Sequence, residues 1–157
     1  LRDRIYPPRE HCTTIAASVT DPGWLDRIPA DRPTLILGEG LTMYLTEADG
    51  LALLRRVVAR FPSGELQFDA FSRFGIRFQV VNAVVRRSGS TLHWAIEKPS
   101  DIVDAVPGVR PVAVQSAFEA HDFGELTRYY RFGQAVLSKV PVLRTISTYH
   151  RYAFGPG

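Results

Sequence analysis

The pattern that most constrains the fold is a strand, helix and strand between residues 34 and 72. Thr34 to Leu37 is a continuous apolar run, typical of a strand buried on both faces of a parallel sheet. Thr46 and Asp49 then have the spacing of a helix capping box, and apolar residues follow at helical intervals. Residues 64 to 72 alternate apolar and polar side chains, as a strand does. This succession predicts an α/β fold with an open sheet.

The rest of the chain continues the same alternation. Its 157 residues, of which 45% are hydrophobic and 22% charged, are ordinary for one globular domain, so we treat residues 1–157 as a single domain. A helix is expected to start at Asp21 and Pro22, because a carboxylate N-cap precedes a proline. The other expected elements are strands at Cys12–Ser18, Val109–Ala117 and Ile146–Phe154 and helices at Ile76–Val85 and Phe123–Val140.

Composition argues against several classes of protein. The net charge is +3 and the arginines are scattered rather than clustered, so we predict no nucleic-acid partner. No run approaches the roughly 20 apolar residues of a membrane span, and no signal peptide opens the chain. Cys12 is the only cysteine, which we interpret as a core thiol of a cytoplasmic protein. The four histidines lack metal-ligand spacing, so we predict no metal site.

Carboxylates occur where two predicted strands end. Gly38, Glu39 and Gly40 follow the strand at Thr34–Leu37, and Asp69 lies near the end of the next strand. Open α/β sheets bind ligands at the carboxyl ends of their strands, and glycines allow close backbone approach to a ligand. A Gly-Glu-Gly triplet alone fits a charged loop equally well. Glu39 and Asp69 are therefore candidate site residues on position.

Other chemical motifs give weaker signals. His121 beside Asp122 is a candidate general base, although such a pair is more often a loop turn. The dinucleotide fingerprint Gly-x-Gly-x-x-Gly is absent, which disfavours a nicotinamide oxidoreductase. The Gly-x-Ser-x-Gly elbow of α/β-hydrolases is absent as well.

A resemblance to a known family rests on three segments in one order and spacing. These are "AASVTD", "ADRPTLILGEGLTMYL" and "GELQFDAFS", which lie between Thr13 and Ser72. Together they resemble the leucine carboxyl methyltransferase family, in particular its bacterial polyketide-synthesis O-methyltransferase-like branch, and a looser match continues to Phe154. The resemblance implies a class I methyltransferase with a Rossmann-like sheet of strand order 3-2-1-4-5-7-6. It also implies the cofactor S-adenosyl-L-methionine and a small-molecule methyl acceptor.

The resemblance also assigns roles to individual positions. Ser18 and Val19 would border the adenine, although Ser18 replaces an acid that some relatives carry. Glu39 and Gly40 would lie near the methionine end of the cofactor. Asp69 would lie near the acceptor, and a carboxylate acceptor would need no base, whereas a hydroxyl acceptor would call on Asp69 or His121 as catalytic residues.

The position of Tyr44 fits either the acceptor pocket or the core.

The family's glycine-rich cofactor motif is not found in the chain. Leu1 to Pro8 resembles the helix that follows the family's second strand. We therefore expect a sheet that lacks the first two strands, with Thr34–Leu37 as an exposed hydrophobic edge. Such a domain would associate with itself or dock with a missing N-terminal segment. The alternative function is a truncated, non-catalytic methyltransferase-like interaction module.

Overall fold

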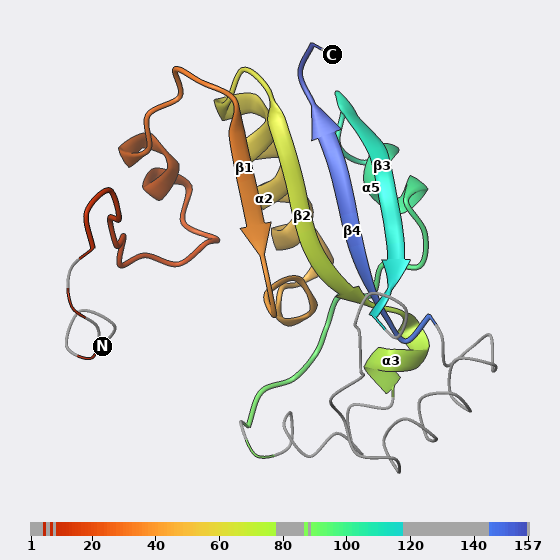
Figure 1. The fold of residues 1–157 in the computed structure, drawn as a ribbon. Helices are drawn as coiled ribbons and strands as arrows, with labels where there is room; N and C mark the ends of the chain where they lie inside the picture. The colour runs from red at the N-terminus through yellow and green to blue at the C-terminus, as the bar shows by residue number, and fades with distance from the viewer. Residues whose placement is uncertain are drawn as a thin grey trace, which may run out of the picture.

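The fold is a mixed sheet of four strands in the order β1-β2-β4-β3, seen in a computed structural model (Figure 1). The structure describes residues 5, 7, 9–77, 87, 89–117 and 145–156. The strands are β1 (Thr34–Gly38), β2 (Gly64–Phe71), β3 (Val109–Ser116) and β4 (Ser147–Phe154). β1 and β2 are parallel, and β4 runs antiparallel to both of its neighbours. This is the order that the resemblance implies for the fourth, fifth, seventh and sixth strands.

The predicted strand–helix–strand unit forms as expected. Helix α2 (Glu47–Arg60) connects β1 to β2 and lies behind them in Figure 1. It begins at Thr46, whose side-chain oxygen accepts a hydrogen bond of 3.1 Å from the backbone N–H of Asp49. Its buried face, with Leu54 and Val57, packs against the sheet and drives the unit together by apolar burial.

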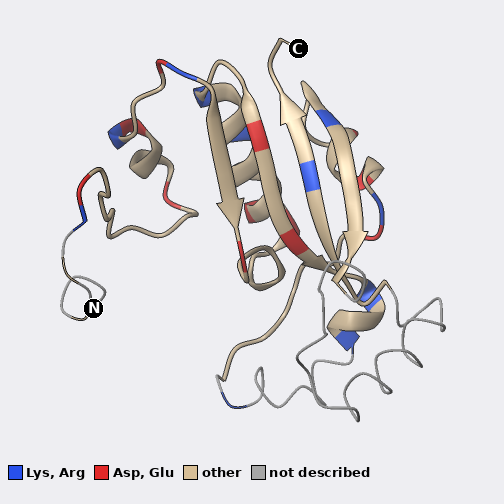
Figure 2. Ribbon diagram, viewed as in Figure 1, with Lys and Arg blue, Asp and Glu red and all other residues tan. Residues whose placement is uncertain are grey.

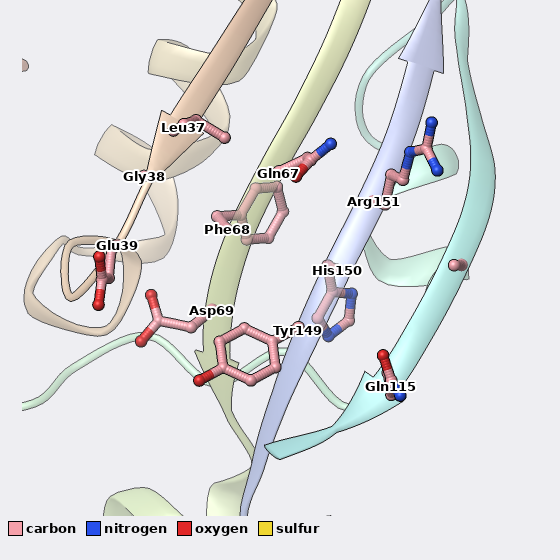
Figure 3. Close-up of a pocket in the computed structure, with 11 residues that line it drawn as sticks. Leu37, Gly38, Glu39, Gln67, Phe68, Asp69, Gln115, Tyr149, His150 and Arg151 are labelled. Carbon is pink, nitrogen blue, oxygen red and sulfur yellow. The ribbon is translucent and has the colours of Figure 1, made fainter. Parts of the chain in front are cut away.

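The two faces of the sheet differ in character because side chains alternate along a strand. In β2, Leu66 and Phe68 face the α2 side and are buried, with exposed fractions of 1% and 6%. Tyr152 and Phe154 of β4 belong to the same core. The opposite face of β2 carries polar side chains, and this is the face turned to the viewer in Figure 3.

The predicted strand at Cys12–Ser18 is wrong. These residues form no strand, and all but the half-buried Ile15 are exposed. Cys12 itself is exposed, so it is not a core thiol. A β-propensity is realised only against a partner strand, and no described strand pairs with this segment. The helix start at Asp21 is confirmed: η1 (Pro22–Arg27) is a 3₁₀ helix, and Asp21 Oδ1 accepts a hydrogen bond of 2.9 Å from the N–H of Gly23.

The remaining helices are short. They are η2 (Thr42–Tyr44), α3 (Arg73–Arg77) and α5 (Ser100–Val103). α3 begins before the helix predicted at Ile76–Val85, most of which lies outside the described residues. The helix predicted at Phe123–Val140 also lies outside them. Within the described part of the chain, no helix has the length and apolarity needed to cross a bilayer.

Candidate functional site

The candidate site lies at one edge of the sheet, where β1, β2 and β3 end and the antiparallel β4 begins. A pocket of about 430 Å³ opens there. It is lined by residues from all four strands and from the loop after β1 (Figure 3). Figure 2 shows acidic positions at these ends of β1 and β2. The fold thus brings side chains from distant parts of the sequence together at the edge where such sheets bind ligands.

Strand register arranges the lining side chains in two rows. Asp69 of β2 pairs with Tyr149 of β4, which pairs in turn with Gln115 of β3, so these three form a row nearest the edge. Paired residues on neighbouring strands present their side chains on the same face, about 5 Å apart at Cβ. The next row along the same face consists of Leu37, Gln67, Arg151 and Ala113.

Asp69 fastens the two strand ends to each other. Its Oδ1 accepts a hydrogen bond of 2.8 Å from the N–H of Gly40, a residue 29 positions away in the sequence. Its backbone carbonyl accepts a hydrogen bond from the hydroxyl of the buried Thr42. Gly40 has φ of 60°, a conformation that favours glycine. These contacts place Glu39 beside Asp69, so the structure brings the two predicted carboxylates together.

Glu39 differs from Asp69 because its carboxylate has no hydrogen-bond or ion-pair partner among the described residues. It is exposed and lies next to Asp69, which separates it from the ring of Tyr149 (Figure 3). A Cβ placed on Gly40 would meet nothing within 4 Å, so the backbone beside Glu39 is open to a ligand. An unpartnered carboxylate at an open backbone is suited to a cationic group.

The cation among the described lining residues is already paired. Arg151 donates two hydrogen bonds to the Glu65 carboxylate, of 2.8 and 2.6 Å. The Arg151 guanidinium, and then the Gln67 amide, lower the pKa of Glu65, while Glu65 raises the pKa of Arg151. The pairing compensates the charge of Arg151. The carboxylates of Glu39 and Asp69 therefore make the pocket negative at the edge of the sheet.

Behind this pocket, the buried face of β4 carries a short polar ladder. His150 lies between the hydroxyls of Thr148 and Tyr152, each 2.9 Å from one of its ring nitrogens. Its ring stacks on Phe68 at a centroid distance of 5.6 Å. Burial lowers the pKa of His150 to about 4, and the carboxylate of Asp101 partly opposes that shift. Burial also raises the pKa of the Tyr152 hydroxyl, so both groups are neutral at pH 7.

The remaining predicted residues lie elsewhere. Ser18 and Val19 do not line this pocket; they belong to a segment that is held on α2. Tyr44 lies in η2 with 39% of its surface exposed and is not a lining residue either. His121 lies outside the described residues. No group of three metal-ligating side chains occurs in the described part of the chain.

Sequence reasoning missed Gln115 and Gln67 as pocket residues, whereas Tyr149 was one of several aromatic residues that fitted either a substrate pocket or the core. The alternation in β4 was a usable signal, because Tyr149 and Arg151 share one face while His150 and Tyr152 share the other. The residue pattern alone did not indicate that β4 inserts between β2 and β3, although the strand order implied by the family resemblance did. That insertion places Tyr149 beside Asp69.

The strand order, the antiparallel β4 and the acidic carboxyl edge define a Rossmann-like methyltransferase fold. Two solved structures share it, each covering 89% of this chain and 53% of its own. A putative methyltransferase from Thermobifida fusca YX superposes with a TM-score of 0.59 at 17% sequence identity. A DUF574 family protein from Streptomyces avermitilis MA-4680 superposes with a TM-score of 0.56 at 14% identity. The predicted fold class is confirmed.

Sequence similarity points to particular relatives. The chain is 37% identical over 154 residues to the tetracenomycin polyketide synthesis O-methyltransferase TcmP of Streptomyces glaucescens. The match covers 98% of this chain and 57% of that protein. The chain is 33% identical over 138 residues to the S-adenosyl-L-methionine-dependent methyltransferase dpfgK of Gibberella zeae, covering 82% of this chain and 45% of that protein. The chain spans about half the length of these relatives. No family model matches it.

These similarities confirm the resemblance seen in the sequence: the chain is similar to one polyketide-synthesis O-methyltransferase and to a second S-adenosyl-L-methionine-dependent methyltransferase.

Proposed function

We propose that this chain is part of an S-adenosyl-L-methionine-dependent O-methyltransferase that acts on a small, polyketide-like metabolite. The observation that carries the proposal is the unpartnered Glu39 carboxylate at the carboxyl end of β1, in a chain similar to a named O-methyltransferase over 98% of its length. The negative charges of Glu39 and Asp69 suit a cofactor that carries an α-ammonium group. The open backbone at Gly40 leaves room for that end of the cofactor.

In this proposal the residues of the chain bind and orient. Glu39 accepts hydrogen bonds from the α-ammonium group, and Gly40 permits close approach of the amino-acid end. Asp69 holds the Gly40 loop in place through its Oδ1. When bound, the cofactor supplies an electrophilic methyl group on sulfur. The protein's main contribution to rate is then to align the acceptor oxygen with that methyl group.

The acceptor is placed beside the row of Asp69, Tyr149 and Gln115. Asp69 Oδ2 has no described partner, so it is available to draw a proton from a hydroxyl acceptor, with His121 as the other candidate base. A carboxylate acceptor would need no base.

Calorimetric titration with S-adenosylhomocysteine tests the cofactor part of this proposal. We expect the chain to bind, and Glu39→Gln to weaken binding about tenfold because a charge-assisted hydrogen bond to the ammonium is lost. Asp104→Asn is the matched control, since it removes one exposed carboxylate outside the pocket. Unchanged affinity in Glu39→Gln would make Glu39 an ordinary loop charge.

The second candidate function is a non-catalytic interaction module. Absence of any binding to the wild-type chain would support it. For an active protein, transfer of a labelled methyl group to a panel of polyketide acceptors separates the two acceptor types: mild alkali releases methanol from a methyl ester and leaves a methyl ether intact.

A further inference from the structure

The segment that contains Ser18 and Val19 is held on α2 by two arginines. Arg56 donates from Nη1 to the carbonyl of Thr20 at 3.1 Å and from Nη2 to the carbonyl of Val19 at 3.0 Å. Arg60, four residues later and so on the same helix face, donates to the carbonyls of Leu25 and Ile28 at 3.3 and 2.9 Å.

Apolar contacts reinforce these hydrogen bonds. Leu25 is buried in the main core with 4% of its surface exposed, and Val19 packs against that core. The indole N–H of Trp24 donates to the same Val19 carbonyl at 3.2 Å. The Val19 carbonyl thus receives donors from both α2 and η1, and its position is determined by both.

The geometry of Arg56 requires an arginine. Its planar guanidinium reaches two successive carbonyls at once, which the single point charge of a lysine cannot do with the same direction. Its Nε is buried and has no hydrogen-bond partner in the described part of the chain. The side chain is therefore held in a desolvated position by its two carbonyl contacts.

Helix α2 connects this segment to Glu39. It starts soon after the Glu39–Gly40 loop, with its first turn capped by Thr46. The rise from Glu47 to Arg56 is roughly 14 Å along the helix axis. No described strand pairing joins residues 12–20 to β1, so the rigid helix sets the position of Val19 relative to Glu39.

We propose that Arg56 is a positioning residue that fixes Ser18 and Val19 at a set distance from Glu39, and thereby sets the spacing between the adenine and methionine ends of the cofactor site. The inference rests on the proposed function and on the adenine-bordering role that the family resemblance implies for Ser18 and Val19. It assigns Arg56 no contact with the cofactor. It acts through the backbone of Val19 and Thr20.

The test compares Arg56→Met with Arg55→Met, using two ligands. Arg55 is a close control because it lies next to Arg56 on α2 and its Nε donates at 2.8 Å to a different backbone carbonyl, that of Ala105. The ligands are S-adenosylhomocysteine and 5′-methylthioadenosine, which lacks the amino-acid end. We expect Arg56→Met to weaken the binding of both ligands about tenfold, because the carbonyls of Val19 and Thr20 lose the two charged hydrogen bonds that hold this segment on α2. Arg55→Met should leave both affinities unchanged.

Glu39→Gln serves as the complementary variant. It should weaken S-adenosylhomocysteine while leaving 5′-methylthioadenosine unchanged, which a general loss of folded protein would not do. Hydrogen exchange with mass spectrometry supplies a readout without ligand: Arg56→Met should lose amide protection over residues 18–28 selectively. Arg56→Lys, which keeps the charge, should give intermediate affinity and guards against misfolding of the methionine variant.

The outcomes separate the two proposals. Wild-type affinity for both ligands in Arg56→Met would overturn the positioning role and leave the proposed function standing. Equal weakening in the Arg55 and Arg56 variants would overturn it as well, because the effect would then be general to α2. No binding of either ligand to the wild-type chain would overturn the proposed function and this inference with it.

Discussion

At the residue scale, similar side chains have roles that their contacts determine. Asp69 and Glu39 are neighbouring carboxylates, yet Asp69 is tied to the N–H of Gly40 while Glu39 has no described partner. The same contrast holds among the histidines. His11 is exposed beside Glu10, whereas His150 is buried between two hydroxyls with a pKa lowered to about 4. Burial therefore makes His150 a group that links stability to pH.

The titration of His150 predicts acid-sensitive stability. Between the unfolded pKa of 6.5 and the folded value of about 4, the unfolded chain binds a proton that the folded chain does not. Stability is therefore complete above pH 6.5 and falls as pH drops towards 4, by about 3 kcal/mol from this group. Urea unfolding between pH 4 and 8 should show the slope in the wild type and a reduced slope in His150→Gln.

His11→Gln is the control for this measurement. It removes an imidazole that is 90% exposed and lies outside the core, so the wild-type slope should be kept. An undiminished slope in His150→Gln would assign the pH dependence to other groups.

At the element scale, α2 contacts several separate parts of the described fold. Its apolar face packs on β1 and β2. Arg56 and Arg60 hold residues 19–28 on the helix, and its N-terminal half contacts Trp94. The last contact depends on Gly50, where an added Cβ would lie 2.0 Å from Trp94 Cζ3 and 2.3 Å from Cε3. Glycine here permits close packing of the indole on the helix, which helix propensity alone does not reveal.

Gly50→Ala should accordingly destabilise the chain. Propensity alone would predict a gain of about 1 kcal/mol in a helix interior, whereas overpacking against the indole should cost about 2 kcal/mol net. Chemical denaturation of Gly50→Ala, Trp94→Leu and the double variant measures the coupling. In the Trp94→Leu background the alanine should become neutral or stabilising. A stabilising effect in the wild-type background would show that the indole moves away without cost.

At the scale of the whole molecule, the two edges of the described sheet differ. β3 is broken by Pro111 and a register shift between Pro111 and Ala113, features that discourage further strand pairing. β1 has neither feature. Its own residues Leu35 and Leu37 are 57% and 68% exposed on the pocket face. An unprotected apolar edge strand is a site of association. We therefore expect the 157-residue chain on its own to associate through β1.

Sedimentation velocity tests this expectation. Leu35→Lys/Leu37→Lys should shift the chain towards a 17.5 kDa monomer, because charges on an edge strand oppose further pairing. Val112→Lys/Val114→Lys on β3, whose side chains are 48% and 41% exposed, should have a smaller effect. A wild-type chain that sediments as a monomer at all concentrations would contradict the prediction.

Local sequence patterns were enough to predict β1, α2 and β2 and to place two carboxylates at strand ends. Periodicity located β1, α2 and β2, capping chemistry located the start of α2, and strand ends marked Glu39 and Asp69. These features are local, because they depend on residues within a few positions of one another. The family resemblance supplied the strand order that the structure has.

Contacts between residues far apart in the sequence became visible in the folded chain. The tertiary structure placed Tyr149 opposite Asp69, brought Arg56 to the carbonyl of Val19 and packed Trp94 on Gly50. It also overturned the strand at Cys12–Ser18, whose composition suits a strand but which has no described partner strand. The physical reason is common to all four: a pairing, a long hydrogen bond or a close packing contact requires two surfaces, and a local pattern specifies only one of them.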